Sequence, residues 1–274
     1  MYRRILIPVS QAADVEPLIR FGASLLDADG EIRVLHVIPI RSLPEVTRRW
    51  RESVALVVPA HEAGAALDVR VDPEVRSAPD VPGEILESAS THSVDAILMT
   101  LRGSRKRANL LVGHTASSVL HHAPCDVMVV NRLALVAGKL ARILVPSLAD
   151  TPPAKAMKIA EELAIRHQGA PIVRLTIARR RTPGTEEAGS TRTPRGITVT
   201  HHRAFLPETI LGRRHRLPEL LLQQAARYRY GLLLVGEEVA HGEGPLLTRR
   251  FLEELFRRAP CPVVAVRGWS GHGE

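Results

Sequence analysis

Short apolar runs alternate with longer amphipathic segments along the whole chain. In the first half the apolar runs have the length of buried strands, and they fall at residues 5–9, 32–38, 67–71, 95–100 and 127–130. The segments between them carry apolar residues at helical spacing, at residues 14–26, 44–66, 83–91 and 115–121. Asp14 stands where the first of these helices would have its N-cap. Such an alternation predicts a parallel sheet with crossover helices.

The second half repeats this order. Its apolar runs predict strands at residues 143–145, 172–177, 197–200, 232–235 and 263–266, and its clearest helical patterns span residues 155–167 and 217–228. Residues 182–195 are rich in Thr, Pro, Gly and Glu. This composition predicts a loop in the place of the long second helix of the first half.

Two repeated motifs indicate that a whole domain is duplicated. RILIP at residues 4–8 recurs 138 positions later as RILVP, and APCDVMVV at residues 123–130 recurs 136 positions later as APCPVVAV. Similar offsets at opposite ends of a unit predict two domains, at residues 1–131 and 141–267, joined by a short linker. The predicted fold is α/β, with two tandem doubly wound (Rossmann-like) five-stranded parallel sheets.

The composition suits this fold. Hydrophobic residues make up 45% of the chain but aromatic residues only 3%, so aliphatic side chains must fill the core, as in parallel sheets covered on both faces. No apolar stretch reaches the length of a membrane span, and the N-terminal MYRR runs directly into the first strand. We therefore expect a cytoplasmic protein without membrane insertion. Cys125 and Cys261, each after a proline at the mouth of a strand, are expected to be buried and reduced.

The net charge of +8 raises the question of nucleic-acid binding. The basic residues are scattered, and neither stacking aromatics nor a helix-turn-helix or zinc-finger spacing is present, so no nucleic-acid partner is predicted. The histidine pairs at 121–122 and 201–202 lack companion ligands at metal spacing, so no metal site is predicted. Ser117 and Ser118 lack a nucleophile-elbow context, and no acid/base pair is visible. An enzymatic function therefore has the weakest support.

Several motifs together resemble the universal stress protein family. They are ILIPV in the first strand, LHV in the second, a glycine-containing loop after the fourth, and the closing segments HHAPCDVMVV and RRAPCPVVAV. The resemblance covers nearly the whole chain, twice. It implies a doubly wound fold and a regulatory function in the stress response.

Nucleotide-binding members of that family carry a loop of the form G-x2-G-x9-G-[ST]. This chain keeps the second and third glycines, as Gly103 and Gly113, whereas Thr100 replaces the first glycine and His114 the hydroxyl residue, with Thr115 next. Such glycines let backbone N–H groups approach phosphate, and the following helix offers its positive end. The resemblance implies that ATP or AMP, with Mg²⁺, binds in the first domain. The implied binding residues are Ser10, Val37, Thr100, Arg102, Gly103, Gly113, His114 and Thr115.

The adenosine side of the site departs from that pattern. Binding members have an acidic residue directly after the first strand, where this chain has Ser10 in one half and Leu148 in the other. A serine replaces a carboxylate only weakly as a hydrogen-bond acceptor, and a leucine not at all. In the second half Gly236 is followed by Glu237 and Glu238, which would repel phosphate. We expect no nucleotide in the second domain.

A second functional hypothesis stays open. Residues 9–20 are also similar to stress-protein modules attached to amino-acid permeases and cation/proton antiporters, which often lack the acidic residue. That similarity implies an interaction module without nucleotide, acting on a protein partner such as a transporter. In either case the fifth strands, residues 127–130 and 263–266, are expected to pair with each other or to form a homodimer, because apolar edge strands seek partners.

Overall fold

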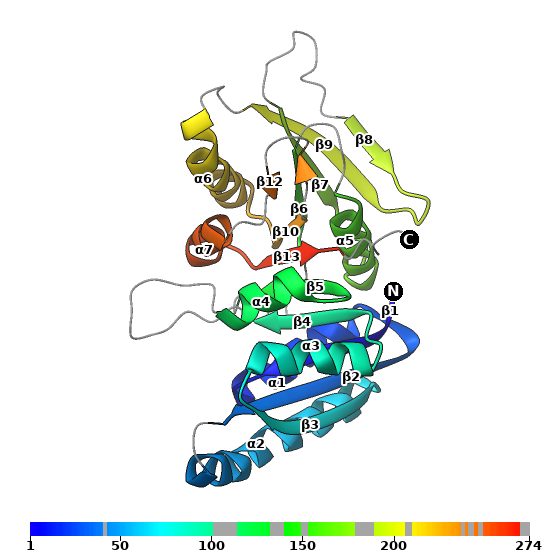
Figure 1. Cartoon of the computed structure of the whole chain (residues 1–274). Helices are drawn as coiled ribbons and strands as arrows, with labels where there is room; N and C mark the ends of the chain where they lie inside the picture. Colours follow the sequence, from blue (N-terminus) through cyan, green and yellow to red (C-terminus); the bar gives the residue numbers. More distant parts are fainter. Residues whose placement is uncertain are drawn as a thin grey trace, which may run out of the picture. The chain divides into compact units, whose positions relative to one another are not determined.

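The chain forms two compact units (Figure 1). The first consists mainly of Met1–Gly103 and Val112–Val130, and the second mainly of Asn131–Val266. The computed structural model describes residues 1–40, 43–100, 114–131, 140–148, 153–178, 189–205, 210–236, 239–240, 244–245 and 249–268. Most of the expected linker lies outside these residues.

The first unit is a five-stranded parallel sheet in the order β3-β2-β1-β4-β5. Its strands are β1 (Tyr2–Val9), β2 (Leu26–Pro39), β3 (Arg70–Ala78), β4 (Ala96–Thr100) and β5 (Asp126–Val130). Its helices are α1 (Val15–Ala23), α2 (Leu43–Leu67), α3 (Val81–Thr91) and α4 (His114–His122), with a short 3-10 turn, η1 (Ala12–Asp14), before α1. The predicted doubly wound sheet is therefore confirmed in this unit.

Close packing of helix on sheet follows from small residues. A Cβ added to Gly22 of α1 would lie 3.3 Å from Ile32, 3.4 Å from Ile7 and 3.5 Å from Leu98, so the helix backbone rests directly on three strands. These aliphatic side chains interdigitate at the densities usual for protein cores. In this unit α1 packs against α2, and α3 against α4. Right-handed crossovers place the two helix pairs on opposite faces of the sheet.

The third strand lies later in the sequence than predicted. The pattern predicts a strand over residues 67–71, but α2 continues to Leu67 and Asp68 takes a left-handed conformation with φ 54°. The strand then runs from Arg70 to Ala78 and pairs with β2 over its whole length. In this unit β3 is the terminal strand, so only one of its edges forms hydrogen bonds with another strand. It therefore tolerates Pro73 and alternating polar residues, a composition that is typical of loops.

The second unit repeats the strand order. The parallel strands run in the order β13-β10-β6-β7-β9, and β8 is added antiparallel to β9. The strands are β6 (Ile143–Leu148), β7 (Ile172–Ala178), β8 (Gly189–Arg192), β9 (Thr198–Phe205), β10 (Leu232–Gly236) and β13 (Val263–Arg267). The helices are α5 (Ala154–Arg166), α6 (Ile210–Tyr228) and α7 (Arg249–Arg258), and β11 (Val239–Ala240) pairs with β12 (Gly244–Pro245).

Part of the loop expected at residues 182–195 is a strand. Residues 189–192 pair with β9 through a tight turn, in which the Gly196 N–H donates to Thr193 O and the Ile197 N–H to Thr193 Oγ1. Gly196 has φ 82°, a conformation that glycine adopts without strain. None of the described helices is long and apolar enough to cross a lipid bilayer.

Candidate functional site

The strand order of the first unit reverses between β1 and β4. After β1 the chain continues into α1 on one face of the sheet, and after β4 it continues into α4 on the other face. The connections therefore run in opposite directions along the sheet from these two strands. In open parallel sheets ligands bind at such a switch point, beyond the carboxyl ends of the strands. Ser10 follows β1 at this edge and Thr100 ends β4.

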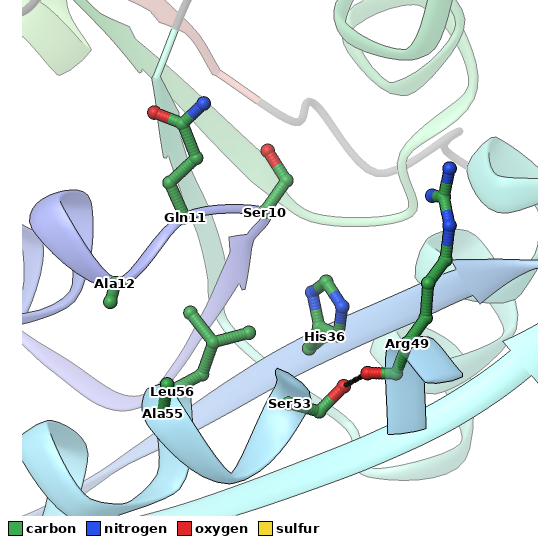
Figure 2. A pocket seen from close by; sticks show the side chains of 8 residues that line it. All are labelled: Ser10, Gln11, Ala12, His36, Arg49, Ser53, Ala55 and Leu56. Carbon is green, nitrogen blue, oxygen red and sulfur yellow. Dashed lines mark hydrogen bonds between the residues drawn. The ribbon is translucent and has the colours of Figure 1, made fainter. Parts of the chain in front are cut away.

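A cavity of about 250 Å³ opens beside this edge, at the carboxyl ends of β1 and β2 (Figure 2). One wall consists of the segment that follows β1 together with His36 of β2, and α2 forms the other. The lining residues are Ser10, Gln11, Ala12, His36, Arg49, Ser53, Ala55 and Leu56. Among them His36 and Arg49 are the side chains that can carry charge, and none is a carboxylate. The cavity therefore favours an anionic or electron-rich ligand.

The His36 ring is held by the backbone of the neighbouring strand. His36 pairs with Val9 in the β1–β2 register, and its Nδ1 lies 2.9 Å from Val9 O. A carbonyl oxygen only accepts hydrogen bonds, so Nδ1 must carry the proton and donate it. Nε2 forms no hydrogen bond with a described residue, and Figure 2 shows the ring between Leu56 and Arg49.

The α2 wall is built from a buried serine and a buried leucine. Ser53 is 2% exposed and Leu56 7%. The Ser53 hydroxyl donates to Arg49 O at 2.8 Å, one helical turn earlier (Figure 2). Because its proton is used within the helix, Ser53 Oγ offers only lone pairs to other partners.

Five of the eight residues expected to bind nucleotide lie within the described part of the chain. Ser10 lines the cavity and is exposed. Val37 is 8% exposed and does not line it, because successive residues of a strand point to opposite faces and His36 takes the cavity side. Thr100 ends β4, and His114 and Thr115 begin α4. Arg102, Gly103 and Gly113 lie outside the described residues.

The cavity residues His36, Arg49 and Ser53 are not among the binding residues that the resemblance implies. His36 belongs to the LHV motif, and the alternation of Val34, His36 and Ile38 on one face of β2 is the signal that marks it. Arg49 and Ser53 lie on α2, and their approach to the strand ends depends on the path of that helix. No local pattern in the sequence reports such a path.

Asp14 does not cap α1 as expected. It occupies the N-cap position, but its side chain makes no capping hydrogen bond. Its φ of −97° and ψ of −14° are helical, because Asp14 is the last residue of η1 and its N–H already donates to Gln11 O. A capping carboxylate requires an extended N-cap residue instead.

The remaining reactive side chains are structural. Burial raises the pKa of the Cys125 thiol to about 12 and that of Cys261 to about 11, so both thiols are protonated at neutral pH and poor nucleophiles. Both cysteines are free and buried, as expected. Within the described part of the chain, no group of three His, Cys, Asp or Glu side chains is placed to hold a metal ion.

The second unit closes the corresponding strand end. Gly236 ends β10, which occupies the same place in its sheet as β4. A Cβ on Gly236 would lie 2.9 Å from the Pro153 Cβ and 3.1 Å from the Ala156 Cβ, so the start of α5 packs against the bare glycine. In the first unit Thr100 carries a side chain at the matching position.

The comparisons with known proteins agree with this fold. Residues 1–131 match the Universal stress protein family. No curated protein sequence matches the chain significantly. A universal stress protein from Archaeoglobus fulgidus superposes with a TM-score of 0.67 at 18% identity, over 96% of this chain and 97% of that chain. A putative universal stress protein from Pseudomonas aeruginosa gives 0.55 at 12% identity, over 97% and 94%.

A third solved structure comes from a transporter. The cytoplasmic domain of a prokaryotic cation chloride cotransporter superposes with a TM-score of 0.58 at 12% identity, over 97% of this chain and 95% of that chain. At these identities the likeness concerns the fold.

Proposed function

We propose that this chain, whose residues 1–131 belong to the universal stress protein family, is a regulatory protein that binds ATP or AMP in its first unit. The observation that carries the proposal is the cavity beside the β1–β4 switch point, lined by His36 and Arg49 and without a carboxylate among its lining residues. An anionic nucleotide suits such a lining electrostatically.

The phosphates would lie at the start of α4, on the β4 side of the switch point. The free N–H groups and the dipole of a helix N-terminus favour negative charge. His114 and Thr115 begin this helix, and Arg102, Gly103 and Gly113 precede it in sequence. With ATP, Mg²⁺ would be held chiefly by the phosphates, since the described residues offer no metal cluster of their own.

Calorimetry on the full chain tests this proposal, with ATP and AMP, each with and without Mg²⁺. Saturable binding of either nucleotide supports it, and a wild-type chain that binds neither overturns it. Gly113→Asp should abolish binding, because a carboxylate would stand where the phosphate loop leads into α4. Gly189→Asp is the matched control, since a Cβ at Gly189 meets no atom within 4 Å.

A second candidate function is an interaction module without nucleotide, acting on a membrane transporter. The specific observation in its favour is the shared fold with a cotransporter's cytoplasmic domain. Co-sedimentation with native membranes tests it. Protease treatment of the membrane surface should release the chain if a transporter holds it, whereas lipid binding would survive the treatment.

The proposal includes a homodimer in the cytoplasm, where the two buried thiols stay reduced. Light scattering coupled to size-exclusion chromatography decides the oligomeric state. A monomeric mass at all concentrations would remove the homodimer from the proposal and leave nucleotide binding untouched.

A further inference from the structure

We propose that the second unit binds an acidic amphipathic helix of a partner protein, on the face of β7 and β9 beside α5. The inference goes beyond nucleotide binding, which concerns the first unit, and does not depend on it. Its basis is a difference between the two copies of the fold. The first copy covers the matching face with a helix of its own, whereas the second carries arginines there.

In the first unit, α1 and α2 lie on the same face of the sheet. A Cβ on Gly22 of α1 would lie 3.3 Å from Ile32 of β2, and a Cβ on Gly64 of α2 would lie 2.7 Å from Val71 of β3. Ile32 and Val71 are direct partners in the β2–β3 register, and paired residues point to the same side of a sheet. A helix of 25 residues therefore covers β2 and β3 on this face.

The matching face of the second unit is the one on which α5 lies. A Cβ on Gly236 of β10 would lie within 3.1 Å of two side chains at the start of α5. Leu232, on the same side of β10, pairs with Ile143 of β6, which pairs with Ile172 of β7. Because alternate residues of a strand share a face, Arg174 also lies on the α5 side of the sheet.

Two strands contribute to this β7–β9 face, which consists of Arg174, Thr176, His201 and Arg203. Arg174 pairs with His201, and Thr176 pairs with Arg203. The arginines and the histidine are half-buried. Burial, and after it the charge of Arg174, lowers the pKa of the His201 imidazole. The two guanidinium groups therefore carry the charge of this face at neutral pH.

The register shows how the chemistry of the face differs between the copies. The repeats RILIP and RILVP align Ile7 with Val145. Ile7 pairs with Val34, whereas Val145 pairs with Arg174. Carried on to the next strand, the alignment sets Val34, Pro73 and Val75 of the first unit against Arg174, His201 and Arg203 of the second. Apolar positions on a helix-covered face have thus become polar and cationic, so an occupant must supply carboxylates.

The surroundings of the face favour a helix over an added strand. Both edges of β9 are hydrogen-bonded, to β7 and to β8, so a partner reaches the face of this strand and not an edge. The described part of the connection between β7 and β9 contains β8 and no helix. In the first unit α2 packs beside α1. A partner's helix would pack beside α5 in the same way.

Helix α5 adds positive charge along this face. Glu162 of α5 accepts from Arg195 in the β8–β9 turn at 2.7 Å, so this side of the helix faces β9. Lys158 and Lys155 precede Glu162 by one and two helical turns and lie on the same side. The helix also rises beside the strands by about its own 10 Å diameter, which keeps a flat bilayer surface away. No Phe, Tyr or Trp stands among the four residues of the face to stack on bases. A protein helix with carboxylates is therefore the partner that fits.

Fluorescence anisotropy on the full chain tests the inference with a labelled helical peptide of about 20 residues, which carries glutamate along one face. A second peptide carries glutamine at the same positions. We expect the wild-type chain to bind the glutamate peptide at least about tenfold more tightly than the glutamine peptide. The difference should shrink at high salt. Similar affinities of the wild-type chain for the two peptides overturn the inference.

Charge reversal shows whether the two arginines hold the peptide. Arg174→Glu combined with Arg203→Glu should abolish binding of the glutamate peptide, because like charges then face each other. The same double variant should bind a lysine peptide of the same design, a gain that loss of folding does not produce. A double variant that keeps the wild-type preference for glutamate overturns the inference.

The matched control is Arg227→Glu combined with Arg229→Glu, which makes the same change in charge on the other side of the sheet. Helix α6 lies on that side, opposite α5 (Figure 1). Tyr228, between the two arginines in sequence, has its ring centroid 6.4 Å from that of His202, which points away from the β7–β9 face. This control should keep the preference for glutamate, and an equal loss in both double variants overturns the inference.

The other occupants of the face are outcomes of the same experiment. A scrambled peptide of the same composition that binds as tightly as the helical one overturns the inference, since no helix is then required. Single-stranded oligonucleotides or phosphatidylglycerol vesicles that require the same two arginines and bind more tightly than the peptide overturn it in favour of a nucleic acid or a membrane. None of these results bears on the binding of ATP or AMP to the first unit.

Discussion

Ser10 lines the same cavity as the two side chains that can carry positive charge there, His36 and Arg49. A carboxylate in its place would face the ribose of a bound nucleotide and accept a hydrogen bond more strongly than a hydroxyl does. We predict that Ser10→Asp raises the affinity for ATP about ten- to a hundredfold, which corresponds to about 1.5–3 kcal/mol for a hydrogen bond to a charged group. Calorimetry on wild type and variant measures the gain.

The control for this substitution is Leu148→Asp, which places a carboxylate at the matching strand end of the second unit. It should leave ATP binding unchanged, because the phosphate-loop pattern is absent from that unit. If Ser10→Asp leaves ATP binding undetectable, the cavity is closed to nucleotide and the interaction-module function is favoured.

At the residue scale the apolar run places Ser10 directly after a buried strand, and the resemblance then implies that this position faces the ligand. The resemblance implies Val37 of β2, whereas its neighbour His36 lines the cavity in the structure. The alternation of faces along β2 decides between these neighbours. Arg49 and Ser53 reach the cavity through the packing of α2, which the local sequence does not encode.

Helix α2 depends on a glycine for its contact with β3. A Cβ on Gly64 would lie 2.7 Å from Val71 Cγ2 and 2.9 Å from Val69 O. Glycine to alanine within a helix ordinarily stabilises by about 1 kcal/mol, whereas overpacking costs about 1–3 kcal/mol. Because backbone atoms form part of the clash, we predict that Gly64→Ala lowers the free energy of unfolding by about 1–2 kcal/mol. Urea unfolding measures it, and Gly189→Ala, with open space at its Cβ, should not destabilise.

The turn between β8 and β9 is tied to α5 by a carboxylate. Glu162 accepts from Arg195 at 2.7 Å and from Arg166 at 3.4 Å. Burial alone would raise the pKa of the Glu162 carboxyl, but the two arginines outweigh it and hold this pKa below its usual value. A carboxyl whose pKa is lower in the folded state than in the unfolded state stabilises the folded state at pH values above its unfolded-state pKa, here about 4.5. This contribution to stability is lost as the pH falls below that value.

We therefore predict that Glu162→Gln destabilises the chain by about 0.5–1 kcal/mol at pH 7, the range of partly exposed ion pairs. The difference from wild type should shrink as the pH falls below about 4, because the wild-type carboxylate is then protonated as well. Urea unfolding at several pH values measures the difference. Glu161→Gln, one residue earlier on α5, is the matched control, and an equal loss in both variants would contradict the role of Arg195.

At the element scale the buried strands were predictable and the polar ones were not. β1, β4 and β10 read as strands because both faces are covered and their residues are aliphatic. β3 and β8 carry polar residues, proline or glycine and are terminal strands within their own units, so hydrogen bonding to one neighbour is what makes them strands. That information is absent from local periodicity.

At the scale of the whole molecule, the repeated motifs predict the duplication of the domain. The strand orders agree, β3-β2-β1-β4-β5 against β9-β7-β6-β10-β13, and the connection between the second and third strands includes α2 in the first unit and β8 in the second. The repeated segments RILIP and APCDV belong to inner and closing strands, which every copy of the fold needs. The connection between the second and third strands lies outside these repeated segments, so its structure can differ between the two units.

The duplicated architecture leads to a prediction about stoichiometry. A chain with two equivalent sites would bind two nucleotides, but the strand ends differ where a nucleotide would lie. In the second unit α5 packs within 2.9 Å of the position that a Cβ on Gly236 would take, and Glu237 and Glu238 follow in sequence. Close packing removes the space, and two carboxylates disfavour phosphate.

We predict one nucleotide per chain, measured as the stoichiometry of ATP binding by calorimetry and by native mass spectrometry. Leu148→Asp should leave this value at one, and Gly113→Asp should bring it to zero. Two nucleotides per chain, or one that survives Gly113→Asp, would place a site in the second unit and refute the asymmetry.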